Sequence, residues 1–195
     1  YLVTSGLGNI TLIDDDYVEN TNLQRQILYI SEDIGKKKAE AAYKRLSEIN
    51  PNINIHQYYE RFTENSSSLI ESADLIIDAT DNFKTRSLIN KITLSLKKPL
   101  VMGAAIKMQG QVAVFRNDLD DMPCYNCLYD NLIDEDTSCL NQGVLSSLTG
   151  VIGSIQATEA LKILLCFGET LESKLLLVDL KYSSFRIVKI KKDPE

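Results

Sequence analysis

Short apolar runs alternate with stretches at helical spacing over the first half of the chain. The run at residues 10–13 ends at three aspartates, Asp14 to Asp16. Apolar residues over 35–49 predict a helix, which Pro51 ends. A strand at 53–55, a short helix at 69–73, a buried strand at 75–79, a helix at 83–97 and a strand at 100–102 follow. This order predicts an α/β fold with a doubly wound, mostly parallel sheet.

The pattern changes in the second half. Residues 111–115 alternate as a strand, a cysteine-containing loop follows, and 150–167 read as an apolar helix. Residues 175–180 and 185–190 have no helix between them, so we expect an antiparallel hairpin. The opening residues 1–5 look like the end of a helix. We expect one domain over 1–195, with antiparallel strands at its C-terminal end.

Composition narrows the class of protein. The 195 residues are 44% hydrophobic and 25% charged, as in an ordinary soluble domain. The net charge is −6 without a basic stripe, so we expect no nucleic-acid partner. No run approaches the roughly 18 consecutive apolar residues of a membrane span, and no secretory leader is visible. We therefore expect a cytoplasmic protein with no membrane partner.

The first group of candidate residues follows the first strand. Asp14 stands at a strand end, where an acid of a doubly wound sheet can bond a ribose hydroxyl. Asn22 and Arg25 follow, then Lys38, and the two basic residues are candidate phosphate partners. The alternative, which spacing alone favours, is that Asp14 caps a strand and the basic side chains are merely solvated.

The second group follows the strand at 75–79. Asp81 at a strand-to-helix junction can hold Mg²⁺ by one carboxylate, with Asn82 beside it and Arg86 one turn further on. The alternative is a helix N-cap, which Asp and Asn both favour. The two interpretations are compatible, because a helix N-cap and a metal ligand can lie at the same strand-to-helix junction.

The cysteines suggest metal chemistry. Cys124 and Cys127 form a CxxC pair, which is half of a four-ligand zinc site. Cys139 lies in a polar loop where a thiol could be exposed. Cys166 lies in a run of leucines, and we expect it to be a small core residue.

Taken together, these motifs resemble those of the ThiF/MoeB/HesA family of sulfur-carrier adenylyltransferases, relatives of the ubiquitin-activating enzymes with a Rossmann-like fold. The resemblance runs in order along nearly the whole chain. Its most specific strings are Asn22-Leu23-Gln24-Arg25-Gln26, Asp78-Ala79-Thr80-Asp81-Asn82 and Pro123-Cys124-Tyr125-Asn126-Cys127.

The resemblance implies a role for each candidate. Asp14 would bind the ribose of ATP. The triphosphate and its Mg²⁺ would be held by Asn22, Arg25, Lys38, Asp81 and Asn82. Cys124 and Cys127 would be two of four Zn²⁺ ligands, and Cys139 matches a position where some members link covalently to the carrier.

The family pattern extends past both ends of this sequence. Its first strand and glycine-rich loop would lie just before Tyr1, and a second CxxC would follow Glu195. We therefore expect the chain to be a domain truncated at both ends. Homodimeric relatives complete the site with an arginine from the partner's N-terminal segment, so the resemblance also implies a homodimer.

By resemblance, the protein activates the C-terminal carboxylate of a small ubiquitin-like carrier that ends in Gly-Gly, of the thiamine or molybdopterin type. Two alternatives stay open. An inactive relative would bind a carrier or serve as a zinc-stabilised scaffold. An NAD-dependent dehydrogenase would use Asp14 equally well, although the CxxC has no role there.

Overall fold

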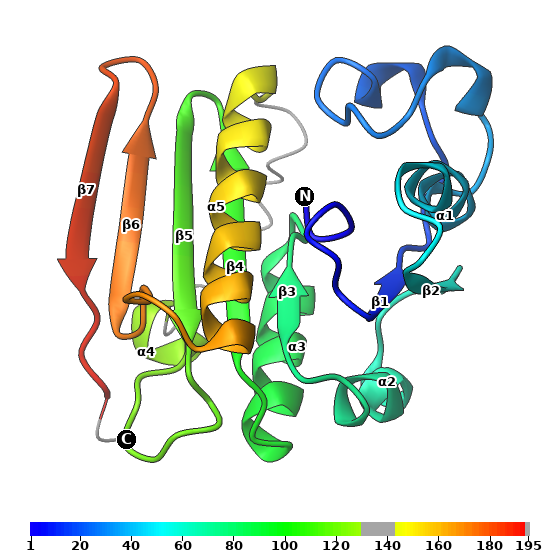
Figure 1. The fold of residues 1–195 in the computed structure, drawn as a ribbon. Helices are drawn as coiled ribbons and strands as arrows, with labels where there is room; N and C mark the ends of the chain where they lie inside the picture. The colour runs from blue at the N-terminus through cyan, green and yellow to red at the C-terminus, as the bar shows by residue number, and fades with distance from the viewer. Residues whose placement is uncertain (130–142, 194–195) are drawn as a thin grey trace. The chain divides into compact units, whose positions relative to one another are not determined.

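The computed structural model describes residues 1–129 and 143–193. The chain divides into two compact units, 1–62 and 63–195, each of which is described below by itself. Figure 1 shows the helices and strands of both units.

The first unit contains one β-α-β element. Strand β1 (Asn9–Ile13) pairs in parallel with β2 (Asn54–Tyr58), and α1 (Lys38–Ile49) connects them. Helix α1 buries small side chains, among them Ala39 and Ala42, which lets the helix pack closely. Two short 3₁₀ helices, Asn20–Asn22 and Ser31–Asp33, lie between β1 and α1. The predicted strands and helix are confirmed.

The opening residues form a turn rather than an assigned helix. The Ser5 N–H donates to the Tyr1 carbonyl at 2.9 Å, which is the hydrogen bond of one helical turn. Gly6 follows with a φ of +83°, a conformation that suits glycine and ends the turn.

The second unit is built on a five-stranded sheet in the order β3-β4-β5-β6-β7. Its elements are, in chain order, a 3₁₀ helix (Glu64–Ser66), α2 (Ser67–Glu71), β3 (Ile76–Asp78), α3 (Phe83–Ser95), β4 (Leu100–Ile106), β5 (Gln109–Phe115), α4 (Tyr125–Tyr129), α5 (Ser146–Leu165), β6 (Lys174–Asp179) and β7 (Ser184–Lys189). Strands β3 and β4 are parallel because α3 crosses between them, and the later pairs are antiparallel.

Helix α5 packs on one face of β4 and β5 (Figure 1). The core on that face contains Val101, Val112, Leu148 and Ile152. At Gly110 a Cβ atom would lie 2.5 Å from the Ile152 side chain, so the absence of a side chain allows the helix to approach. On the other face, Tyr125 and Tyr129 of α4 contact Phe115 and Gln111 of β5.

Helix α5 is the one described helix that is long and apolar enough to cross a membrane by length and composition. The same properties are found in core helices of soluble proteins. Here the helix carries Glu159, which is buried, accepts the backbone N–H of Leu171 at 2.7 Å and pairs with Lys162 at 2.6 Å. The buried residues Leu148 and Ile152 pack on the sheet, as expected of a core helix.

The predicted α/β class, with parallel strands followed by antiparallel ones, is confirmed. The expected majority of parallel pairs is wrong for the described sheets, because β4 and β5 are joined by a tight turn at Lys107 instead of a crossover helix.

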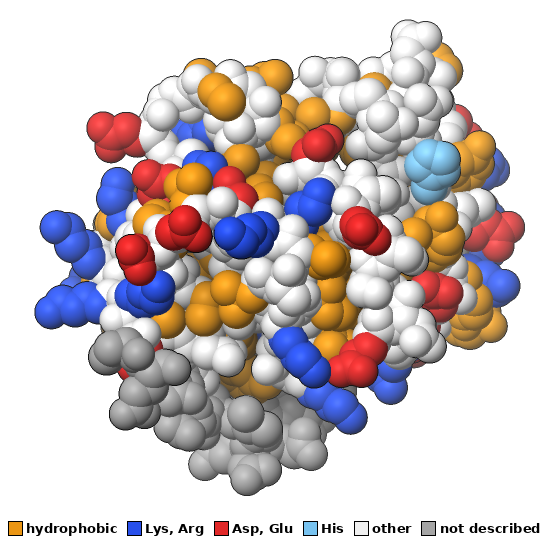
Figure 2. All heavy atoms as spheres, turned by 90° about the horizontal axis from the view of Figure 1, so that it is seen from below, with side chains coloured by type: hydrophobic (Ala, Val, Ile, Leu, Met, Phe, Trp, Pro, Cys, Tyr) orange, Lys and Arg blue, Asp and Glu red, His pale blue; other side chains and the backbone are white. Residues whose placement is uncertain are grey.

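Acidic and basic side chains are interspersed on the face of the molecule that Figure 2 shows.

Candidate functional site

Three consecutive aspartates follow β1. The Asp14 carboxylate accepts the Asp16 N–H at 2.8 Å, and the Lys38 ammonium lies 2.7 Å from the Asp16 carboxylate. Burial raises the pKa of Asp14, an effect that the Asp16 N–H and the Lys38 charge partly offset. Lys38, at the start of α1, has a side chain only 10% exposed. The fold therefore places Lys38 close enough to Asp14 for its charge to act on that carboxyl, while its ion pair is with Asp16.

The segment between β1 and α1 positions two further candidates. Asn22 is buried, and its side-chain oxygen accepts the Glu19 N–H at 3.1 Å. This bond closes the 3₁₀ turn at 20–22. Arg25 follows the turn, and one of its guanidinium nitrogens donates to the Thr21 carbonyl at 2.9 Å. Asn22 thus orders the loop that carries Arg25.

The end of β3 carries the remaining nucleotide candidates. Asp81 is exposed, and among the described residues its carboxylate meets only the Asn82 amide, at 3.5 Å. Asn82 is the N-cap of α3, because its side chain accepts the Thr85 N–H at 2.9 Å. The N-cap interpretation of Asp81 is therefore wrong, since the following residue performs that role. The Asp81 carboxylate faces solvent at a strand end, which suits a Mg²⁺ ligand.

Sequence reasoning gave no role to Asp78, the last residue of β3. Its side chain is buried, and one carboxylate oxygen accepts both the backbone N–H and the hydroxyl of Thr80, at 2.8 and 2.7 Å. Burial raises the pKa of Asp78, and the nearby charge of Arg86 partly offsets that effect. An acid inside the otherwise apolar run at 75–79 was the signal that could have identified it.

The two cysteines of the CxxC pair lie side by side at the start of α4. The Cys124 and Cys127 sulfurs are 3.8 Å apart, and both thiols are free. Two ligands at a Zn–S distance of about 2.3 Å in a tetrahedral site lie about 3.8 Å apart. The N–H groups of Cys124 and Asp193 donate to the Cys127 sulfur at 3.3 and 3.4 Å. The geometry fits half of a zinc site.

Of the other two cysteines, Cys139 lies outside the described residues. The expectation that Cys166 belongs to the core is wrong. It is exposed at the C-cap of α5, where a left-handed backbone conformation (φ 51°) turns the chain away from the helix.

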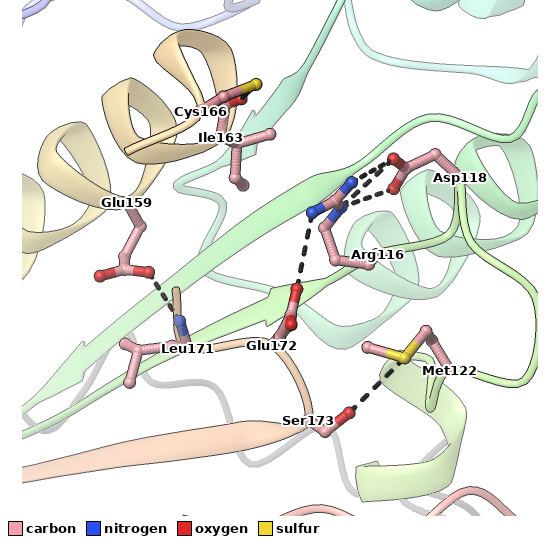
Figure 3. Close-up of polar contacts among 9 residues, drawn as sticks. All are labelled: Arg116, Asp118, Met122, Glu159, Ile163, Cys166, Leu171, Glu172 and Ser173. Atoms are coloured by element: carbon pink, nitrogen blue, oxygen red, sulfur yellow. Dashed lines mark hydrogen bonds and ion pairs between the residues drawn. The ribbon is translucent and has the colours of Figure 1, made fainter. Parts of the chain in front are cut away.

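A cavity of about 410 Å³ lies beside Cys166. Its walls include Arg116, Lys162 and Glu172. Figure 3 shows Arg116 between Asp118 and Glu172, at 2.7 and 3.5 Å. Because these charges are paired with one another and no predicted site residue lines the cavity, we do not assign it to the nucleotide.

The nucleotide candidates are divided between the two compact units. The first unit carries Asp14, Asn22, Arg25 and Lys38, whereas Asp81 and Asn82 belong to the second. Both sets follow a strand, β1 in one unit and β3 in the other. Ligands of open α/β sheets bind at such carboxyl ends of strands.

Comparison with known proteins identifies the family. The model of the ThiF family matches residues 1–195. A sulfur carrier protein adenylyltransferase of Thermus thermophilus is 42% identical over 100% of this chain and 74% of its own length. The molybdopterin-synthase adenylyltransferase of Escherichia coli is 40% identical over 100% of this chain and 78% of its own length.

Solved structures show the same fold. The crystal structure of E. coli MccB with MccA-N7isoASN aligns over 98% of this chain and 59% of its own, with a TM-score of 0.84 and 21% identity. The chain thus spans less than two thirds of that protein. The family predicted from the sequence motifs is confirmed, and the chain belongs to the ThiF family.

Proposed function

We propose that the chain is an ATP-dependent adenylyltransferase that activates the C-terminal glycine carboxylate of a small ubiquitin-like sulfur-carrier protein. The observation that carries the proposal is the match of the whole chain to the ThiF family, together with relatives named as adenylyltransferases of such carriers. The placement of Asp14 and Asp81 after strand ends, with Lys38 at the start of α1, supports it. Neither the family nor these names fit a nicotinamide dehydrogenase.

In the proposed reaction a carboxylate oxygen of the carrier attacks the α-phosphorus of ATP. A new O–P bond forms, and the bond between the α-phosphorus and the bridging oxygen breaks, with its electrons leaving on pyrophosphate. The carboxylate is already ionised at neutral pH, so no side chain need remove a proton. The barrier is mostly charge repulsion and positioning.

The side chains divide this work. Arg25 and Lys38 place positive charge against the phosphates, Asn22 orders the loop that holds Arg25, and Asp14 accepts a ribose hydroxyl. Asp81 would hold Mg²⁺ beside Asn82, and the ion, when bound, screens the phosphate charge. Cys139 is the proposed covalent link to the carrier.

The central test is exchange of radiolabelled pyrophosphate into ATP. We expect exchange only with a carrier that ends in an intact Gly-Gly, because the carboxylate must reach the α-phosphorus. A carrier without its last glycine is the control, and carriers of the thiamine and molybdopterin types should both be tried. An inactive scaffold would still bind a carrier but support no exchange with any of them.

We further propose that Zn²⁺ is held by Cys124 and Cys127 with two more ligands, which supplies folding energy without taking part in the reaction. Metal analysis should find zinc in the purified protein and none in Cys124→Ser, which should also melt earlier. Cys166→Ser is the matched control, because that thiol is exposed and lies at the C-cap of α5, outside the CxxC pair. Equal zinc content in all three proteins would contradict the assignment.

A homodimer that acts in the cytoplasm completes the proposal. The end of helix α5 leaves two apolar side chains exposed, Leu165 at 65% and Phe167 at 51%. An apolar surface of this kind is often covered by a partner. Light scattering during gel filtration should give twice the chain mass, and a monomeric mass at assay concentration would refute this part.

A further inference from the structure

The turn that carries Asp81 is held by two buried side chains, Asp78 before it and Arg86 after it. Thr80 precedes Asp81, and Asn82, which follows it, is fixed as the N-cap of α3. The Thr80 N–H and hydroxyl bind the Asp78 carboxylate at 2.8 and 2.7 Å. Asp81 is therefore an exposed residue between two fixed neighbours.

The Thr80 carbonyl is bound as well, by Arg86. Its Nε donates to that oxygen at 3.1 Å, Nη2 donates to the same oxygen, and Nη2 also reaches the Gly103 carbonyl of β4 at 3.4 Å. Arg86 is only 9% exposed although it carries a full charge. The guanidinium thus ties the turn after β3 to the neighbouring strand.

This geometry differs from that of a simple buried ion pair. An Arg–carboxylate pair usually forms two parallel hydrogen bonds. Here the Arg86 guanidinium donates to carbonyls rather than to the Asp78 carboxylate. Among the described residues, the second carboxylate oxygen of Asp78 is buried without a hydrogen-bond partner. Leaving a buried acceptor without a partner is costly. Arg86 therefore holds the Thr80 carbonyl, and the Asp78 carboxylate lacks the hydrogen bonds that a direct pair with Arg86 would give it.

A third buried side chain, that of Gln156, binds the backbone carbonyl of Asp78. The amide of Gln156, on α5, donates to the Asp78 carbonyl at 2.9 Å and to the Val101 carbonyl at 3.4 Å. A side chain at Gly103 would collide with this amide, so the glycine leaves room for it. The support of the turn thus extends into the core of the second unit.

We propose that Asp78 and Arg86 are positioning residues, which hold the backbone N–H and the backbone carbonyl of Thr80 and thereby aim Asp81 at the metal of the nucleotide. The proposal rests on the function proposed above. A metal ligand must be held within about 0.5 Å of its productive position. Groups that orient a ligand typically contribute about 10- to 100-fold in metal affinity or activity.

Arg86→Lys tests the proposal, because lysine keeps the charge but cannot bind both carbonyls with a planar fork. We expect a folded protein in which pyrophosphate exchange falls by about 10- to 100-fold and the Mg²⁺ concentration for half-maximal exchange rises by a similar factor. Excess Mg²⁺ should restore part of the activity. In the metal-free and nucleotide-free protein, the Thr80 amide should exchange hydrogen faster than in the unmodified protein.

Arg116→Lys is the matched control, because Arg116 is a partly buried arginine that pairs with Asp118 and Glu172 instead of carbonyls. It should change the melting temperature without changing the Mg²⁺ requirement or Thr80 exchange. Asp78→Asn is the second test variant. It keeps an acceptor for Thr80 but loses the charge opposite Arg86, and it should raise the Mg²⁺ requirement.

The proposal is overturned if the folded variants melt earlier but keep the Mg²⁺ dependence and Thr80 protection of the unmodified protein. Failure of both variants to fold would assign the two residues to stability alone and would overturn it too. If the unmodified protein supports no exchange with any carrier, the proposed function fails. Hydrogen exchange at Thr80 then still decides whether Arg86 holds the turn.

Discussion

Asp81→Ala is expected to lower pyrophosphate exchange by at least about 10²- to 10³-fold, since the charge stabilisation lost at the α-phosphate is of that order. The stability should change little, within about 0.5 kcal/mol, because the side chain is exposed and is not the cap of α3. The two quantities are measured on the same preparation by exchange kinetics and thermal unfolding.

Two controls separate the metal role from the capping role. Asp74→Ala removes an exposed carboxylate just before β3, at the other end of the strand, and should leave exchange unchanged. Asn82→Ala removes the cap and should cost about 0.5–2 kcal/mol of stability. An Asp81→Ala protein that melts earlier yet exchanges at the normal rate would remove the core of the assignment.

Lys38→Met should have the second-largest effect, a loss of exchange of about 10²- to 10³-fold, if its ammonium meets the phosphates. Methionine retains the buried stem of the side chain and removes only the charge. The ion pair with Asp16 is the competing explanation for this lysine. Because the Asp16 side chain is 67% exposed, that pair should be worth at most about 1 kcal/mol.

Asp16→Asn distinguishes the two explanations. It breaks the pair but leaves the Lys38 ammonium in place, so exchange should survive while the Lys38→Met protein is inactive. ATP binding, measured by titration calorimetry, should weaken only in Lys38→Met. Normal exchange in Lys38→Met would show that Lys38 stabilises the fold and does not bind the nucleotide.

The periodicity of the sequence by itself determined the main elements. Strands β1 and β3, helices α1 and α3 and the hairpin of β6 and β7 all lie within a few residues of their predicted ranges. Apolar spacing reports which face of an element is buried, and that information is local. The acids that follow β1 and β3 were also readable, because strand ends are where a doubly wound sheet binds ligands.

Only the tertiary structure decided between chemically equivalent neighbours. Asp81 and Asn82 are both good N-caps, and the backbone of the turn selected Asn82. Cys166 reads as a core residue beside its leucines, but the end of α5 turns it into solvent. In both cases the deciding quantity was a backbone conformation, which residue type does not specify.

The support of the Asp81 turn was beyond the reach of sequence patterns. Gln156 meets the carbonyl of Asp78 from 78 positions away, and Arg86 reaches Gly103 on the next strand. These partners come together only when α5 and β4 pack around the end of β3. The sequence could therefore indicate Asp81 as a candidate metal ligand, whereas the packing of distant elements decided which residues surround its turn.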